Sequence, residues 1–123
     1  VLLVEDNALN QQVATELLEI SGMVVDVANN GREGVDMAQV KDYDLILMDR
    51  KMPDLDGLTA CRRIRSEVPA SRQPQIVAMT ASVTALDRQA CLDAGMDDFI
   101  SKPVRKQALA EVLTRIAASA PVG

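Results

Sequence analysis

Five side chains that can bind a cation or a phosphoryl group stand at or just after the ends of short apolar segments: Glu5, Asp6, Asp49, Thr80 and Lys102. Three carboxylates in one place repel one another, so burying them together is costly unless a cation intervenes. Mg²⁺ meets this need because it prefers oxygen ligands and is usually held by one or two carboxylates together with a phosphate. The residue types therefore predict a Mg²⁺ site that serves phosphoryl chemistry.

Asp49 is the predicted acceptor in this chemistry, since an aspartate carboxylate can act as a nucleophile and carry an acyl phosphate. Mg²⁺ and Lys102 would offset charge on the phosphoryl oxygens, and the Thr80 hydroxyl would bond the attached group. Each residue alone has an ordinary alternative: a helix-capping turn for the paired acids, a solvated cation for Lys102 and a satisfied hydroxyl for Thr80. Their joint occurrence at successive segment ends favours the functional interpretation.

The elements that must position these side chains are visible as apolar runs at 1–4, 23–27, 45–48, 75–79 and 98–100. Such runs predict strands that are buried on both faces, and an amphipathic helical pattern follows each of them. Strict alternation predicts an α/β fold, a doubly wound five-stranded parallel sheet with five helices. Ligands bind such a sheet beyond the carboxyl ends of its strands, which is where the five polar side chains are expected.

The helix boundaries have their own signals. Asn7 is expected to cap the first helix, and Asn30 with Glu33 resembles a capping box for the second. Gly22 and Gly95 follow the first and fourth helices, as helix-terminating glycines do. The chain has 123 residues, the usual length of one domain, and it opens inside the first strand. We therefore expect residues 1–123 to form a single domain that belongs to a longer protein.

The composition disfavours several functions. With a net charge of −5 and only Tyr43 and Phe99 as aromatic residues, the chain has few means of binding nucleic acid. No apolar run approaches the roughly 20 residues that span a bilayer, so we expect a cytoplasmic location without direct membrane contact. The chain contains no histidine, so a phosphohistidine donor must lie elsewhere. Cys61 and Cys91 are expected to be buried, reduced thiols.

Several short segments together resemble the motifs of one family: residues 4–7, 47–49 with 52–53 and 56–57, 79–81, and 99–103. At this spacing they resemble the receiver domain of two-component response regulators over essentially the whole chain. The resemblance implies a flavodoxin-like (CheY-like) fold with strand order 2-1-3-4-5 and phosphorylation of Asp49. It also implies that Mg²⁺ is held by the carboxylates of Glu5, Asp6 and Asp49 and by the backbone carbonyl of Lys51.

The resemblance further implies a conformational switch. In the family, the hydroxyl at Thr80, in the motif that ends at Ala81, moves toward the phosphoryl group, and the aromatic side chain at Phe99 turns inward. This rearrangement alters the face formed by the fourth helix, the fifth strand and the fifth helix. Phe99 alone would be an ordinary core aromatic residue. The peptide bond between Lys102 and Pro103 is expected to be cis.

Finer features resemble the receivers of hybrid sensor histidine kinases: Asn7, Asn10, Val13, residues 95–98 and residues 102–104. The implied partners are a histidine kinase transmitter domain and a histidine phosphotransfer domain. Such a receiver catalyses its own phosphorylation and dephosphorylation without being an independent enzyme. A stand-alone response regulator that acts by protein contacts is the alternative. An Asp-nucleophile phosphohydrolase is disfavoured, because no second acid follows Asp49 closely to protonate a leaving group.

Arg50 and Lys51 depart from the pattern of hybrid-type receivers, which more usually carry a small apolar residue and an uncharged polar residue there. Two cations beside an acidic pocket would weaken Mg²⁺ binding or change how water reaches the acyl phosphate. We therefore hypothesise that Lys51 tunes the lifetime of the phosphorylated state. The alternative is a solvated pair of cations with little effect.

Overall fold

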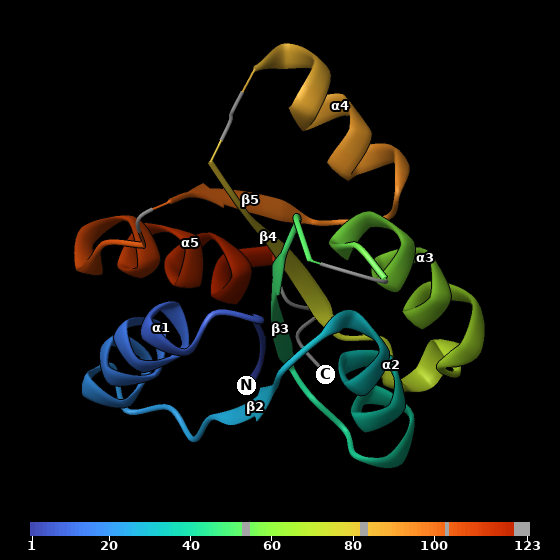
Figure 1. Cartoon of the computed structure of the whole chain (residues 1–123), viewed down its shortest axis with the longest axis horizontal. Coiled ribbons are helices and arrows are strands. Elements are labelled where there is room, and N and C mark those ends of the chain that lie inside the picture. The colour runs from blue at the N-terminus through green and yellow to red at the C-terminus, as the bar shows by residue number, and fades with distance from the viewer. Residues whose placement is uncertain (53–54, 82–83, 103, 120–123) are drawn as a thin grey trace.

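The computed structural model describes residues 1–52, 55–81, 84–102 and 104–119, with side chains described through residue 115. Five parallel strands form a sheet in the order β2-β1-β3-β4-β5, as the resemblance implied: β1 (Leu2–Val4), β2 (Asp26–Ala28), β3 (Leu45–Asp49), β4 (Gln75–Thr80) and β5 (Asp98–Ser101). The helices are α1 (Ala8–Ile20), α2 (Gly31–Val40), α3 (Gly57–Glu67), α4 (Ala85–Asp93) and α5 (Lys106–Ser119), with a short 3-10 helix at Ala70–Arg72. The predicted alternation of strands and helices is confirmed (Figure 1).

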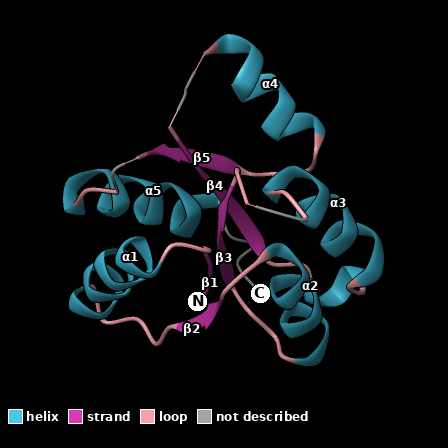
Figure 2. Cartoon of the chain, in the orientation of Figure 1, coloured by secondary structure: helices cyan, strands magenta, loops and turns pink. Residues whose placement is uncertain are grey.

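The helices cover both faces of the sheet (Figure 2). The side chains of α1 and α5 form one core cluster with the sheet, and those of α2, α3 and α4 form the other. Within β3, Ile46 and Met48 belong to one cluster while Leu45 and Leu47 belong to the other, because successive side chains of a strand point to opposite faces. Because helices cover both faces, the ends of the strands remain accessible. Within the described residues, no helix is long and apolar enough to cross a membrane.

The predicted helix ends are confirmed by their geometry. The side chains of Asn7 and Asn30 accept hydrogen bonds from the third following backbone N–H, at 3.1 and 2.8 Å. Gly22 and Gly95 follow α1 and α4 with φ of 87° and 97°, in the left-handed region that favours glycine. The Asn7 cap defines where the connection after β1 enters α1. It therefore helps to place Glu5 and Asp6.

The predicted position of the second strand was wrong. A strand was expected at 23–27, whereas β2 comprises Asp26–Ala28. The Met23 N–H instead donates to the Leu18 carbonyl at 3.1 Å and completes the end of α1, and Val24 is 80% exposed. Because β2 is an edge strand that pairs with β1 alone, only a short part of the apolar run is drawn into the sheet.

Cys61 and Cys91 are free and buried, as the sequence predicted. Burial raises the pKa of the Cys61 thiol to about 11 and also raises the pKa of Cys91. Both side chains therefore stay protonated at neutral pH and act as small apolar residues of the core.

Candidate functional site

The predicted site residues stand at the carboxyl edge of the sheet, on four strand ends. Glu5 directly follows β1, and Asp49 and Thr80 are the last residues of β3 and β4. Lys102 follows β5, and its backbone N–H donates to the Thr80 carbonyl at 2.8 Å. Because β1, β3 and β4 are paired on both sides and Lys102 is tied to β4 by its backbone N–H, the fold fixes the backbone of each residue.

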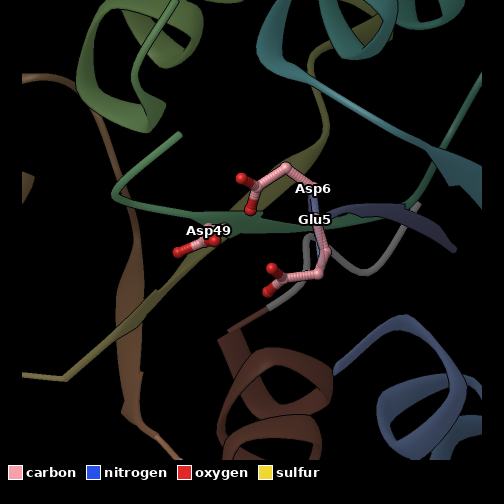
Figure 3. Close-up of side chains that lie close together, drawn as sticks. All are labelled: Glu5, Asp6 and Asp49. Atoms are coloured by element: carbon pink, nitrogen blue, oxygen red, sulfur yellow. The ribbon is translucent and has the colours of Figure 1, made fainter. Parts of the chain in front are cut away.

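Three carboxylates gather at this edge. Glu5, Asp6 and Asp49 each offer an oxygen atom, and these atoms lie within 4.8 Å of one another. Figure 3 shows the three side chains, with Glu5 and Asp6 coming from the end of β1 and Asp49 from the neighbouring β3. Glu5 and Asp49 are only 1% and 2% exposed, whereas Asp6 is exposed. The cluster is therefore a partly buried acidic pocket that opens to solvent at Asp6.

Lys102 is the counter-charge of the two buried acids. Its Nζ lies 2.7 Å from Asp49 Oδ1 and 3.3 Å from Glu5 Oε2. The Lys102 side chain is half-buried, and although burial alone lowers its pKa, the hydrogen bond and charge of Asp49 and the charge of Glu5 raise the pKa overall. The ammonium group is thus charged throughout the physiological range, and it is shared between two carboxylates.

Glu5 ionises less readily than a free glutamate. Its pKa is raised to about 7, with burial as the largest cause and the Asp49 carboxyl as a further one, against the opposing effects of the Asn7 N–H and Lys102. A cation bound beside Glu5 would favour its charged form.

Backbone groups hold the carboxylates in place. The Asn7 N–H donates to Glu5 Oε1 at 3.1 Å, and the Lys51 N–H donates to Asp49 Oδ1 at 3.2 Å. Gln11, which the sequence did not single out, donates from Nε2 to the Glu5 carbonyl at 2.6 Å. No signal in the sequence predicts this hydrogen bond, because Gln11 resembles any other polar residue of an amphipathic helix.

The donor set fits a hard divalent cation. Three carboxylate oxygens from Glu5, Asp6 and Asp49 lie close enough to share one ion. Oxygen ligands from few carboxylates, with one side open to water and phosphate, are typical of Mg²⁺ sites. The pocket is therefore a candidate Mg²⁺ centre.

The residues of the predicted switch belong to β4, the residue that follows it, and β5. Thr80 is 5% exposed, and Ala81, which follows it, is exposed. Phe99 is half-buried against the core, with the Arg88 guanidinium carbon 4.8 Å from its ring centroid. The movements of Thr80 and Phe99 stay predictions. The expected cis bond before Pro103 lies outside the described residues.

The two cations that follow Asp49 have different surroundings. Lys51 is exposed, so its predicted effect on the phosphorylated state stays a prediction. Arg50 is not a solvated cation, because its Nη1 forms an ion pair with Asp87 Oδ1 of α4 and its side chain is only 19% exposed. The interpretation of both residues as a solvated pair was therefore wrong for Arg50.

Comparisons with known proteins agree with this geometry. Residues 1–114 match the family described as the response regulator receiver domain. The chain is 43% identical over 115 residues to the aerobic respiration control sensor protein ArcB of Escherichia coli K12, with 94% of this chain and 15% of ArcB covered. The receiver domain of sensor histidine kinase PA1611 from Pseudomonas aeruginosa PAO1 is 41% identical, with a TM-score of 0.86 and 96% of each chain covered. That domain was crystallised with a magnesium ion coordinated in its active site cleft.

A further structural relative belongs to the complex of the Saccharomyces cerevisiae phosphotransfer protein Ypd1 with the receiver domain of the response regulator Ssk1. It is 32% identical, with a TM-score of 0.86, 95% of this chain covered and 87% of that chain. The chain spans 6% to 15% of the length of the hybrid kinases of Dictyostelium discoideum and Escherichia coli that it matches. The strand order, the acidic edge and the match over residues 1–114 agree. The chain belongs to the response regulator receiver domain family.

Proposed function

We propose that Asp49 accepts a phosphoryl group from a phosphohistidine of another domain and passes it on or holds it as a signal. The observation that carries this proposal is the arrangement of one buried carboxylate, Asp49, 2.7 Å from the Lys102 ammonium and within 4.8 Å of the Glu5 and Asp6 oxygens. This arrangement brings together a nucleophile, the Lys102 ammonium group and a set of carboxylates that can bind a metal ion.

The transfer step is a displacement at phosphorus. An Asp49 carboxylate oxygen forms a bond to phosphorus while the phosphorus–nitrogen bond of the donor breaks and its electron pair stays on the imidazole. Lys102 remains beside the acceptor and offsets the charge of the phosphoryl oxygens, and Thr80 is the proposed hydroxyl partner of the attached group. Hydrolysis ends the signal when a water oxygen bonds to phosphorus and the Asp49 carboxylate leaves.

Mg²⁺ is the proposed cofactor, held by the carboxylates of Glu5, Asp6 and Asp49 and by the backbone carbonyl of Lys51. When bound, this ion neutralises the charge that develops on the phosphoryl oxygens. The carboxylate spacing and the raised pKa of Glu5 support the assignment, as does the magnesium ion in the PA1611 receiver domain.

The surface beside Asp49 supports a protein partner rather than a small substrate. Leu9 and Val13 of α1 are 68% and 41% exposed, although both are apolar. They line a pocket of about 250 Å³, which is bounded at the acceptor edge by Glu5 and Lys102. An apolar surface next to a phosphoacceptor suits a helix that carries a histidine, and the Ypd1–Ssk1 complex joins a phosphotransfer protein to a receiver.

We infer that the partners are a histidine kinase transmitter domain and a histidine phosphotransfer domain, and that the domain works in the cytoplasm as part of a hybrid sensor kinase. The match to ArcB over 94% of this chain supports this parent protein, and the two free thiols are consistent with a reducing compartment.

The deciding experiment is incubation with acetyl phosphate and Mg²⁺, followed by intact-mass measurement. We expect one phosphoryl adduct on the wild-type chain, none after Asp49→Asn and none when EDTA replaces Mg²⁺. Asp56→Asn is the matched control, because Asp56 lies nearby and caps α3 through the Thr59 N–H, a role that asparagine also fills. An adduct that persists in Asp49→Asn contradicts the proposal.

A further inference from the structure

Arg50 occupies a distinctive position, since it directly follows the acceptor Asp49 yet its side chain is directed to another element. Its Nη1 forms an ion pair with Asp87 Oδ1 in the first turn of α4, and the two side chains are 19% and 22% exposed. The guanidinium that stands nearest to Asp49 along the chain is therefore used, in this structure, to hold a helix.

The backbone of Arg50 is a fixed base for this contact. Its N–H donates to the Met79 carbonyl of β4 at 3.0 Å, and its carbonyl accepts from the Gly57 N–H at the start of α3, also at 3.0 Å. A Cβ atom at Gly57 would lie 2.2 Å from the Asp49 carbonyl oxygen and 2.8 Å from the Arg50 Cα, so only glycine permits this close approach. These contacts fix the backbone from which the Arg50 side chain extends.

Asp87 connects the ion pair to the beginning of α4. Its other carboxylate oxygen accepts a hydrogen bond from Thr84 Oγ1 at 2.7 Å, and its backbone N–H donates to the same hydroxyl at 3.2 Å. Arg50 thus contacts the chain on both sides of the connection that begins at Thr80, through Met79 before it and through Asp87 after it. The ion pair therefore links the end of β3 to the first turn of α4.

Apolar packing holds α4 only weakly. Cys91 is the buried residue within its nine positions, while Leu86 and Leu92 are 85% and 55% exposed. Figure 1 shows α4 at the margin of the molecule, beyond β5. In the first turn of α4, the Arg88 guanidinium also lies over the ring of Phe99 of β5. A single ion pair can therefore change the stability of α4 appreciably.

We propose that the Arg50–Asp87 ion pair restrains α4 while Asp49 is unphosphorylated, and that a phosphoryl group on Asp49 draws Arg50 away from Asp87. This inference rests on the proposed phosphorylation of Asp49. Phosphorylation replaces one carboxylate charge by a group of about two negative charges, one residue from the guanidinium. Phosphoryl oxygens are strong partners for arginine, so they compete with the Asp87 carboxylate and release the helix.

The restraint is tested by hydrogen exchange of the α4 amides in the unphosphorylated chain. Arg50→Met, Asp87→Asn and the double variant should each exchange about fivefold faster in α4, the factor expected for one half-buried ion pair. The double variant should exceed neither single variant, because all three remove the same contact. Arg62→Met, which removes an exposed arginine of α3, is the control and should leave α4 unchanged. Unchanged exchange in Arg50→Met, or effects that multiply in the double variant, would overturn the restraint.

The release is tested by repeating the measurement with acetyl phosphate and Mg²⁺. Phosphorylation should raise α4 exchange in the wild type to the rate of Arg50→Met and should cause no further rise in that variant. A purely structural ion pair would give the same phosphorylation response in both proteins, and that result would overturn the inference while leaving Asp49 as the acceptor. If the wild type forms no adduct at all, the proposed function fails and the release fails with it, whereas the first comparison still decides the restraint.

Discussion

Glu5 should make the metal-free protein less stable as the pH rises. In the folded chain the pKa of Glu5 is raised from 4.5 to about 7, first by burial and then by the Asp49 carboxyl. The folded state therefore keeps a proton that the unfolded chain releases near pH 4.5. Between these two values the folded state binds more protons than the unfolded state, so the free energy of unfolding falls with rising pH.

The size of this effect follows from the difference between the two pKa values. From about pH 5 to about pH 8, Glu5 should lower the free energy of unfolding by about 2–3 kcal/mol. A domain of this size is stabilised by roughly 5–15 kcal/mol, so the loss is readily measured. The chain contains no histidine, so no imidazole titrates in the same window. Saturating Mg²⁺ should recover part of the loss at the higher pH, because the ion binds the folded state with Glu5 ionised.

Urea denaturation in EDTA, followed by circular dichroism, measures this dependence at the two pH values. Glu5→Gln keeps the shape of the side chain but cannot ionise, so it should lose the pH dependence that Glu5 causes. Glu19→Gln makes the same chemical change at an exposed position of α1 and should behave as the wild type does. If Glu5→Gln and the wild type lose the same stability between the two pH values, the electrostatic account of the pocket is wrong.

Two further predictions concern the contacts of the Arg65 side chain and the apolar surface formed by Leu9 and Val13. Arg65 donates to the Gly95 carbonyl, Gln73 Oε1, the Pro74 carbonyl and Asp97 Oδ2 at 2.7–2.8 Å, so Arg65→Met should lower the free energy of unfolding by about 2–3 kcal/mol. Arg63→Met removes an exposed pair with Glu67 and should cause no resolvable change in the same urea titration; equal losses in the two variants would contradict this reasoning. Val13→Asp should slow phosphoryl transfer from a phosphorylated phosphotransfer protein at least tenfold, an order-of-magnitude expectation for a charge placed in an apolar contact, while phosphorylation by acetyl phosphate stays as in the wild type. Equal slowing with both donors would show that Val13 acts through the acceptor site and not through docking.

The acceptor edge could be predicted from the sequence because its signals are local. Asp49 and Thr80 each end an apolar run that is buried on both faces, and the short length of such runs favours strands over helices. The edge strand β2 was misplaced because its apolar run begins at Met23, before the residues that pair with β1, which are Asp26–Ala28. The ion pair of Arg50 with Asp87 could not be predicted, since its partners lie 37 residues apart and meet only through the placement of α4.

Two cations near the acceptor, Lys102 and Arg50, have different partners. This difference would explain how phosphorylation of Asp49 affects α4. Lys102 lies inside the pocket and is shared by Glu5 and Asp49. Arg50, the next residue along the chain, is directed instead to α4. Because β3 is buried along its whole length and paired on both sides, we expect the acceptor strand itself to move little when Asp49 is phosphorylated. We expect the response in α4 instead, because this helix has one buried residue and an arginine ion pair at its first turn.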